Sequence, residues 1–116
     1  MATIEDFQKL EIKIGKVLSA ERIEGSDKLL KLQFDIGEEE PRQVLAGIAE
    51  HIAEPESLVG KEMPLVLNLE PRKLRGEMSN GMMLAVSIDD PSTSLETGKP
   101  ILLHPAEEVP PGSIVR

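Results

Sequence analysis

The sequence feature that most constrains the fold is an alternation of apolar and polar residues in the first third of the chain. Four apolar residues are separated from one another by single polar residues: Leu30, Leu32, Phe34 and Ile36. This period of two is typical of a β-strand with one buried face and one face in water. A charged turn follows, and residues 42–48 then form a second apolar stretch, so the pattern predicts an antiparallel hairpin.

An earlier strand is expected over residues 12–18, where Ile12 and Ile14 alternate with Lys13. The alternation slips at Gly15–Lys16, and a glycine at such a slip predicts a bulge or a sharp bend. Long, bent first strands are how small barrels turn their corners.

Two apolar runs in the second half of the chain predict the fourth and fifth strands. Leu65–Leu69 and Met82–Ile88 are short and bounded by proline and glycine, so they suit buried strands better than helices. The strands that contain them are expected over Glu62–Leu69 and Gly81–Ile88. A short helix or helical turn, broken at Pro55, is expected before the first run. Five strands with a helix between the third and fourth form an OB-fold barrel, so the predicted class is all-β with a short helix.

The two ends of the chain are expected to add smaller elements. Residues 3–10 carry apolar side chains at three-residue spacing, which predicts an amphipathic helical turn that closes one end of the core. Both Phe7 and Phe34 are expected in that core. The segment Asp89–Gly98 is rich in turn formers and predicts an exposed loop. A sixth short strand is expected over residues 99–103.

Length and composition limit the class of protein. The chain has 116 residues, which predicts a single domain over residues 1–116. It has no cysteine, which excludes disulfides and thiol chemistry and fits the cytoplasm. No secretory signal is expected from the N-terminal sequence, and no apolar run approaches the roughly 20 residues of a membrane-spanning helix.

The net charge of −8 counts against a nucleic-acid binder, which usually carries a basic surface. The charges are unevenly distributed, because residues 65–83 hold three cations and only two anions, Glu70 and Glu77. Distant charges are screened beyond about 10 Å at ~0.1 M salt. A local cationic patch on an acidic protein can therefore still attract a polyanion.

The loop expected between the two apolar runs carries the three cations Arg72, Lys73 and Arg75. Arginine offers a planar fork that suits phosphate, and lysine offers a mobile point charge. Spaced along an extended loop, these side chains would follow a sugar–phosphate backbone. A solvated loop without a ligand is the alternative interpretation, and the residues alone favour neither.

Further polar residues are candidates for the same site. Lys28 and Arg42 lie on neighbouring predicted strands and would extend the cationic patch if the register places them on one face. Ser79 precedes a turn, where its hydroxyl either caps that turn or donates to a phosphate.

Three residues near this loop are expected to have structural roles. Asn68 interrupts an apolar run, so its amide must find partners if it is buried, which favours a role in tying down the adjacent loop. Gly81 opens the predicted fifth strand. Met82 is expected to pack in the core or in an interface.

The sequence shows no constellation of catalytic residues. Neither His51 nor His104 has a partner histidine at metal-ligand spacing. There is no glycine-rich phosphate loop and no G-x-S-x-G elbow. We therefore expect a binding protein that is not an enzyme and uses no cofactor or metal. With two Phe and no Tyr or Trp, base stacking is weak, so an RNA would be recognised by backbone shape and charge.

Seven segments, in order and at ordinary spacing, resemble a known family. They are DFQKLEIKIGKV (Asp6–Val17), GSDKLLKLQFDIGEE (Gly25–Glu39), RQVLAGI (Arg42–Ile48), LVGK (Leu58–Lys61), NLEPRKLRG (Asn68–Gly76), SNGMMLA (Ser79–Ala85) and VPPG (Val109–Gly112). Together they run through nearly the whole chain. They resemble the tRNA-binding domain found at the C-terminus of bacterial methionyl-tRNA synthetases and as free-standing tRNA-binding proteins.

The resemblance implies an OB-fold with a C-terminal extension, a homodimer formed through that extension, and tRNA binding with little regard to tRNA identity. It also implies methionyl-tRNA synthetase as a partner. The residues that match the family and carry a cationic or hydroxyl group are expected to contact tRNA: Lys28, Arg42, Arg72, Lys73, Arg75 and Ser79. Asn68 and Met82 match other positions of the family pattern.

One residue departs from the family pattern: Glu77 stands where an aliphatic residue is expected, next to the cations that it could neutralise. Two alternatives to tRNA binding follow. Export-associated chaperones of the same superfamily bind peptides through a dimer groove, and a pure docking module would bind a protein partner without touching RNA. The intact SNGM and PRKLRG segments favour tRNA.

Overall fold

The structure is a computed structural model that describes residues 1–89 and 98–116. Most of the loop expected at Asp89–Gly98 lies outside the described residues. The elements follow one another as α1 (Ile4–Gln8), β1 (Ile12–Arg22), β2 (Leu30–Asp35), β3 (Arg42–Ala46), the 3₁₀ turns η1 (Ala49–His51) and η2 (Pro55–Leu58), β4 (Glu62–Val66), β5 (Arg72–Leu74), β6 (Glu77–Ser79), β7 (Met82–Met83), β8 (Ala85–Ile88) and β9 (Lys99–Leu102).

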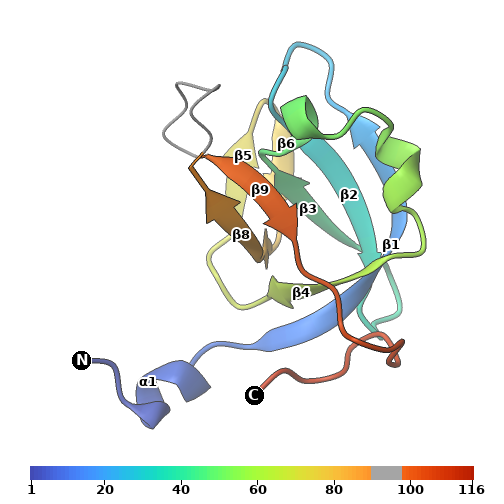
Figure 1. The fold of residues 1–116 in the computed structure, drawn as a ribbon. Coiled ribbons are helices and arrows are strands. Elements are labelled where there is room, and N and C mark those ends of the chain that lie inside the picture. The colour runs from blue at the N-terminus through green and yellow to red at the C-terminus, as the bar shows by residue number, and fades with distance from the viewer. Residues whose placement is uncertain (90–97) are drawn as a thin grey trace.

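Five strands form one antiparallel sheet in the order β3-β2-β1-β4-β7, and β5–β6 and β8–β9 form two separate hairpins. The sheet curls into a barrel (Figure 1). The open side is bridged next to β6, where the Asn80 N–H donates to the Gln43 carbonyl at 2.9 Å and the Leu45 N–H donates to the Ser79 hydroxyl at 3.0 Å. With its helical turns between β3 and β4, this is the predicted OB-fold barrel.

Strand β1 turns the corner of the barrel, because its first half pairs with β4 and its second half pairs with β2. The bulge lies between Val17 and Ser19, two residues later than predicted, with Leu18 as the extra residue. Gly15 has a different role. A Cβ at this position would lie 2.6 Å from Leu65 Cδ1 and 3.0 Å from Phe34 Cδ1, so the glycine lets core side chains approach the bent strand.

The core fills the barrel as the alternation predicts. In β2 the apolar residues are buried and the polar residues between them are half-buried. The largest fully buried side chains come from four strands: Val17, Leu30, Leu32, Phe34, Val44, Met63 and Leu65. Each such side chain contributes roughly 1.5–3 kcal/mol through removal from water.

Helix α1 is present, but the expectation that it closes the core is wrong. Its N-terminus carries a full capping box between Thr3 and Asp6, yet none of its residues is buried. Phe7, which was expected in the core, is 38% exposed. The reason is topological, because α1 lies before the start of β1 and projects away from the barrel (Figure 1).

The second apolar run is also not the buried strand that its composition predicts. It is divided into β7 and β8, and all four residues of β8 are exposed. In the described chain, strand β8 pairs only with β9, and Leu102 of β9 packs against the core while β8 stays exposed. None of the helices described in residues 1–89 and 98–116 has the length and apolar character needed to cross a membrane.

Candidate nucleic-acid interface

The segment that was expected to be a loop between two strands is itself a β-hairpin. Strands β5 and β6 pair residue by residue, with Lys73 opposite Met78 and Leu74 opposite Glu77. The two residues between them, Arg75 and Gly76, both have positive φ, 52° and 80°. This is the backbone of a type I′ turn, which matches the twist of paired strands. We call residues Arg72–Ser79 the cationic hairpin.

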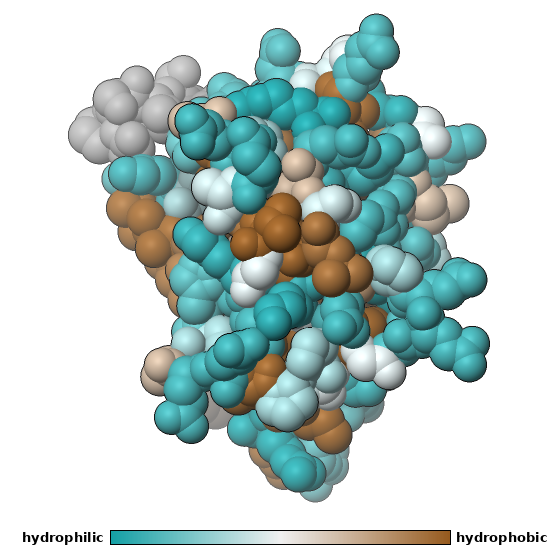
Figure 2. All heavy atoms as spheres, turned by 90° about the vertical axis from the view of Figure 1, so that its right-hand side faces the viewer, coloured by the Kyte–Doolittle hydropathy of each residue, from teal (hydrophilic) through white to brown (hydrophobic). Residues whose placement is uncertain are grey.

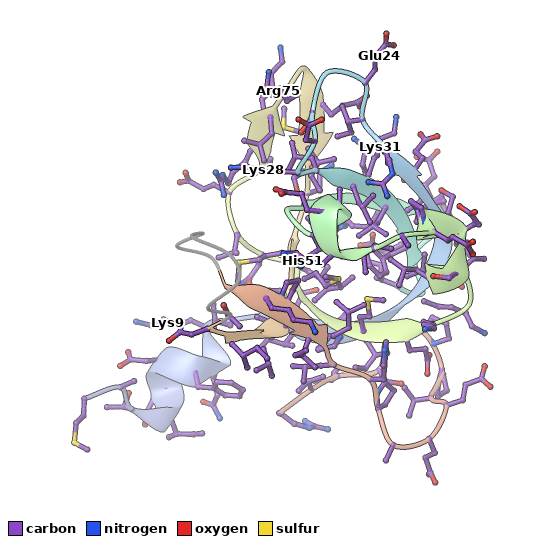
Figure 3. All side chains as sticks on the ribbon, turned by 45° about the horizontal axis from the view of Figure 1, so that its top comes forward. Lys9, Glu24, Lys28, Lys31, His51 and Arg75 are labelled. Atoms are coloured by element: carbon purple, nitrogen blue, oxygen red, sulfur yellow. The ribbon has the colours of Figure 1, made fainter. Side chains whose placement is uncertain are left out.

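The three cations of this hairpin are available to a ligand. Arg72, Lys73 and Arg75 are all exposed. Among the ion pairs found in the described part of the chain, none involves these three residues. In Figure 3, Arg75 extends into solvent from the tip of the hairpin. Their charges are therefore not neutralised by a carboxylate of the described residues.

Glu77 does not neutralise them, because its side chain reaches the barrel instead. One carboxylate oxygen lies 3.3 Å from Lys31 Nζ, and the other accepts a hydrogen bond of 3.3 Å from Gln43 Nε2. Lys31 also contacts Glu21 at 3.1 Å. The Glu21 carboxylate, and after it the Glu77 carboxylate, raise the pKa of the Lys31 ammonium above its ordinary value.

Ser79 lies beneath the hairpin and is 6% exposed. Its hydroxyl accepts the Leu45 N–H at 3.0 Å and donates to the Gly81 carbonyl at 3.0 Å. The hydroxyl thus both accepts and donates a hydrogen bond within the chain, and Ser79 joins β6 to β3.

Arg42 is similarly committed to partners within the chain. Its guanidinium pairs with Glu38 at 3.0 Å and donates to the backbone carbonyls of Leu67 and Asn80 at 3.2 and 2.9 Å. The Arg42 side chain is 22% exposed. It therefore ties three segments of the barrel together rather than extending the exposed patch.

Lys28 is exposed on the connection between β1 and β2. In Figure 3 it lies at the same end of the barrel as Arg75 at the tip of the cationic hairpin. Its neighbour Leu29 lines a groove under the hairpin together with Arg72 and Leu74. Lys28 and Arg42 are the two positively charged candidates outside the hairpin. Of these two, Lys28 is the one with an exposed charge near the hairpin.

The three residues expected to be structural occupy different places. Asn68 joins two segments, since its Oδ1 accepts the Glu11 N–H and its Nδ2 donates to the Lys9 carbonyl, both at 2.7 Å. Gly81 allows a close approach, because a Cβ there would lie 3.1 Å from the Val66 carbonyl oxygen. Met82 is half exposed and lines the groove under the hairpin.

The polar network that supports the hairpin was not predicted from any sequence pattern. Gln33 Nε2 donates to Gln43 Oε1 at 2.8 Å, and Gln43 in turn contacts Glu77 and the Met78 carbonyl. These residues lie on three different strands, so only the strand register brings them together. Within the described ranges, no group of three or more His, Cys, Asp or Glu residues could hold a metal ion.

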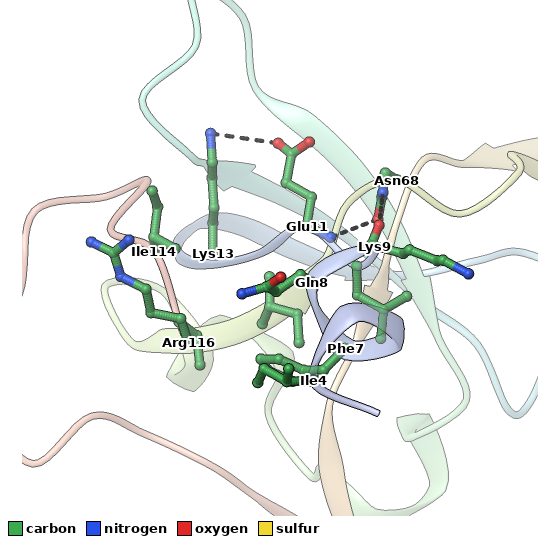
Figure 4. Close-up of a pocket in the computed structure, with 12 residues that line it drawn as sticks. Ile4, Phe7, Gln8, Lys9, Glu11, Lys13, Asn68, Ile114 and Arg116 are labelled. Atoms are coloured by element: carbon green, nitrogen blue, oxygen red, sulfur yellow. Dashed lines mark hydrogen bonds and ion pairs between the residues drawn. The ribbon is translucent and has the colours of Figure 1, made fainter. Parts of the chain in front are cut away.

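A second surface feature lies at the N-terminal end. The pocket in Figure 4 is lined by α1, the start of β1 and the last residues of the chain, and it includes the Asn68 contact to Glu11. Its apolar lining includes one buried residue, Ile12, and five exposed ones: Ile4, Phe7, Leu10, Ile114 and Val115. The face shown in Figure 2 is by contrast largely hydrophilic, with a small apolar patch near its centre.

Comparisons with known proteins agree on one family. The model of the family described as "Putative tRNA binding domain" matches residues 12–114. Methionine–tRNA ligases from Clostridium tetani and Methanococcoides burtonii are 49% and 48% identical over 114 and 115 residues, or 98% and 99% of this chain. The chain spans only 16% of the length of each of these relatives.

Solved structures show the same fold over the whole chain. The crystal structure of a MetRS-related protein from Pyrococcus horikoshii has a TM-score of 0.85 and 38% identity, covering 100% of this chain and 98% of that one. The chaperone CsaA from Bacillus anthracis has a TM-score of 0.82 and 32% identity, covering 100% and 99%. From the family model and these relatives together, we conclude that the chain belongs to the tRNA-binding domain family.

Proposed function

We propose that the cationic hairpin contacts the sugar–phosphate backbone of tRNA. The observation that carries the proposal is that Arg72, Lys73 and Arg75 are exposed together and without carboxylate partners in the described residues, although the protein as a whole is acidic. An acidic chain that leaves three cations free on one hairpin concentrates its attraction for polyanions there. Phosphate contacts of this kind supply affinity without reading sequence.

The proposed contact set is smaller than the family pattern implies. It comprises four exposed cations: Lys28, Arg72, Lys73 and Arg75. Arg42 and Ser79 support the hairpin from beneath, because their polar groups already have partners. The chain has no Tyr or Trp for base stacking, so shape and charge would determine recognition.

We propose that a second copy of the chain covers the apolar residues of α1 and the C-terminal end. The five-residue helix α1 buries none of its residues against its own barrel. Its apolar side chains and those of Ile114 and Val115 line one pocket. Pairing two such faces would bury them and would place two cationic hairpins on one particle.

We further propose that the chain acts by binding rather than by catalysis, in the cytoplasm, and raises the tRNA affinity of a methionyl-tRNA synthetase, as part of it or beside it. The support is the similarity to the two methionine–tRNA ligases, of which the chain spans a small part. Binding energy added away from a reaction centre raises affinity without requiring catalytic groups in the added domain.

The similarity to a protein described as a chaperone makes peptide binding the competing function. The two are separated by titrating the protein with bulk tRNA and with an unfolded polypeptide at two salt concentrations. Phosphate binding predicts that log affinity for tRNA falls with log salt at roughly −0.7 to −0.9 per phosphate neutralised. Tight, salt-insensitive binding to the polypeptide and none to tRNA would contradict the proposal.

A further inference from the structure

The cationic hairpin is held to the barrel at two levels. At its base, Ser79 and Asn80 bond to β3, through the Leu45 N–H and the Gln43 carbonyl. Nearer the tip, the residue that contacts the barrel is Glu77, which pairs with Leu74 directly beside the turn. The base contacts fix where the hairpin leaves the barrel, and Glu77 is placed to fix its tilt.

The contacts of Glu77 join the hairpin to two strands at once. Its carboxylate reaches Lys31 on β2 and Gln43 on β3, each at 3.3 Å. Gln43 is itself held by Gln33 at 2.8 Å, and it donates to the Met78 carbonyl at 2.9 Å. The side chains of Lys31 and Glu77 are 24% and 35% exposed, so this contact is partly shielded from water.

We propose that Glu77 is a positioning residue for tRNA binding: its carboxylate braces the cationic hairpin against β2 and β3, so that Lys73 and Arg75 are already in place when the RNA arrives. This inference rests on the proposed function. A hairpin that is braced before binding loses less conformational freedom on binding, which improves affinity. Glu77 is next to the cations in sequence, but its carboxylate contacts Lys31 and Gln43 of the barrel.

A charge-only account makes the opposite prediction. If Glu77 acted only by neutralising the hairpin, any variant that removes its charge would bind tRNA more tightly. Glu77→Ala and Glu77→Gln remove the same charge, but only glutamine keeps one oxygen, which can still accept the bond from Gln43 Nε2. The two variants therefore separate bracing from neutralisation at equal net charge.

The test measures tRNA affinity at fixed salt for the wild type, Glu77→Ala and Glu77→Gln. We expect Glu77→Ala to bind roughly two- to tenfold more weakly, as for the ordering of one or two side chains, and Glu77→Gln to bind at least as tightly as the wild type. Equal affinities of the two variants, above or below wild type, would overturn the inference. Backbone ¹⁵N relaxation at Arg75 and Gly76 should show added motion only in Glu77→Ala.

A second pair of variants tests the partner of Glu77. Lys31→Met should weaken binding, and adding Glu77→Ala to it should cause a smaller loss than Glu77→Ala causes alone, because the Lys31–Glu77 contact is then already absent. If Glu77 acted only by neutralisation, the effects of the two substitutions on tRNA affinity would instead offset each other.

The charge-reversal variant K73E/R75E distinguishes failure of the proposed function from failure of the inference alone. If it binds as the wild type does, the proposed function fails and the inference with it. If K73E/R75E loses tRNA binding while Glu77→Ala and Glu77→Gln have equal tRNA affinity, only the inference fails.

Discussion

Arg75 and Gly76 form the two central positions of the turn at the tip of the cationic hairpin, and both have a left-handed backbone. Glycine adopts this conformation without cost, whereas an arginine does so under strain, and Asn-Gly is the preferred pair for such a turn. The strongest hairpin signal in a sequence is therefore missing here, and a strained cation stands in its place. The strain is tolerated at an exposed position at the tip of the hairpin.

Replacing Arg75 with asparagine should separate the turn from the charge. We expect Arg75→Asn to stabilise the protein slightly, by up to about 1 kcal/mol, because asparagine tolerates the left-handed region better. The same variant should bind tRNA more weakly, because one phosphate contact is lost. Urea unfolding and tRNA titration measure the two effects, and Arg75→Lys serves as the control that keeps the charge. The account would be contradicted if Arg75→Lys weakened tRNA binding and Arg75→Asn did not.

The packing around Gly15 predicts a large effect of a single methyl group. A Cβ at Gly15 would approach Leu65 Cδ1 to 2.6 Å, so Gly15→Ala should destabilise the protein by about 1–3 kcal/mol through overpacking. Gly47 is the matched control, because nothing lies within 4 Å of a Cβ built there. Gly47→Ala should leave the urea midpoint nearly unchanged, and equal effects of the two substitutions would show that β1 is not packed as described.

The capping box of α1 predicts a pH dependence. The Thr3 N–H donates to the Asp6 carboxylate at 3.0 Å, and this bond, helped by Lys9, lowers the pKa of Asp6. A carboxyl group with a lowered pKa in the folded state stabilises the helix fully above its ordinary pKa, and this contribution is lost as pH falls through the lowered value. NMR signals of α1 should therefore change toward those of an unfolded segment between about pH 5 and pH 2. In Asp6→Asn the same signals should depend much less on pH.

The apolar face at α1 predicts the oligomeric state. Phe7→Asp should convert the proposed dimer to a monomer, because it places a charge in a face that a second copy would bury. The molar mass from light scattering should fall by about half while the circular dichroism spectrum is retained. Val59, which is 49% exposed on the turn after η2, provides the matched control, since Val59→Asp should leave the mass unchanged. A monomeric wild type at all concentrations would contradict the proposed pairing.

Much of the barrel could be predicted because its signals are local. The alternation in β2 places Leu30, Leu32 and Phe34 on one face, and the strand buries that face. Thr3 and Asp6 have the spacing of a capping box and form one. The bulge was displaced, because Gly15 marks a close approach of core side chains while the extra residue is Leu18.

The remaining features depend on what an element packs against, which periodicity does not encode. The apolar residues of α1 and β8 were predicted to be buried, yet the topology leaves both elements outside the barrel. The exposed cations could be predicted from their position in the sequence, between two apolar runs. The contacts that support the hairpin could not be predicted in this way. Lys31, Gln43 and Glu77 are far apart in sequence and meet only through the register of β2, β3 and the hairpin.

The most direct test of tRNA binding by the cationic hairpin compares two double variants of equal charge. K73E/R75E reverses two hairpin cations, and K61E/K99E reverses two exposed cations on other elements. In a filter-binding titration with bulk tRNA across a range of salt, the wild type should show a log–log slope of about −2 to −4 per chain. K73E/R75E should lose most of its affinity and of this slope, while K61E/K99E should stay close to wild type. Equal losses in both variants would show that overall charge, and not the hairpin, governs binding.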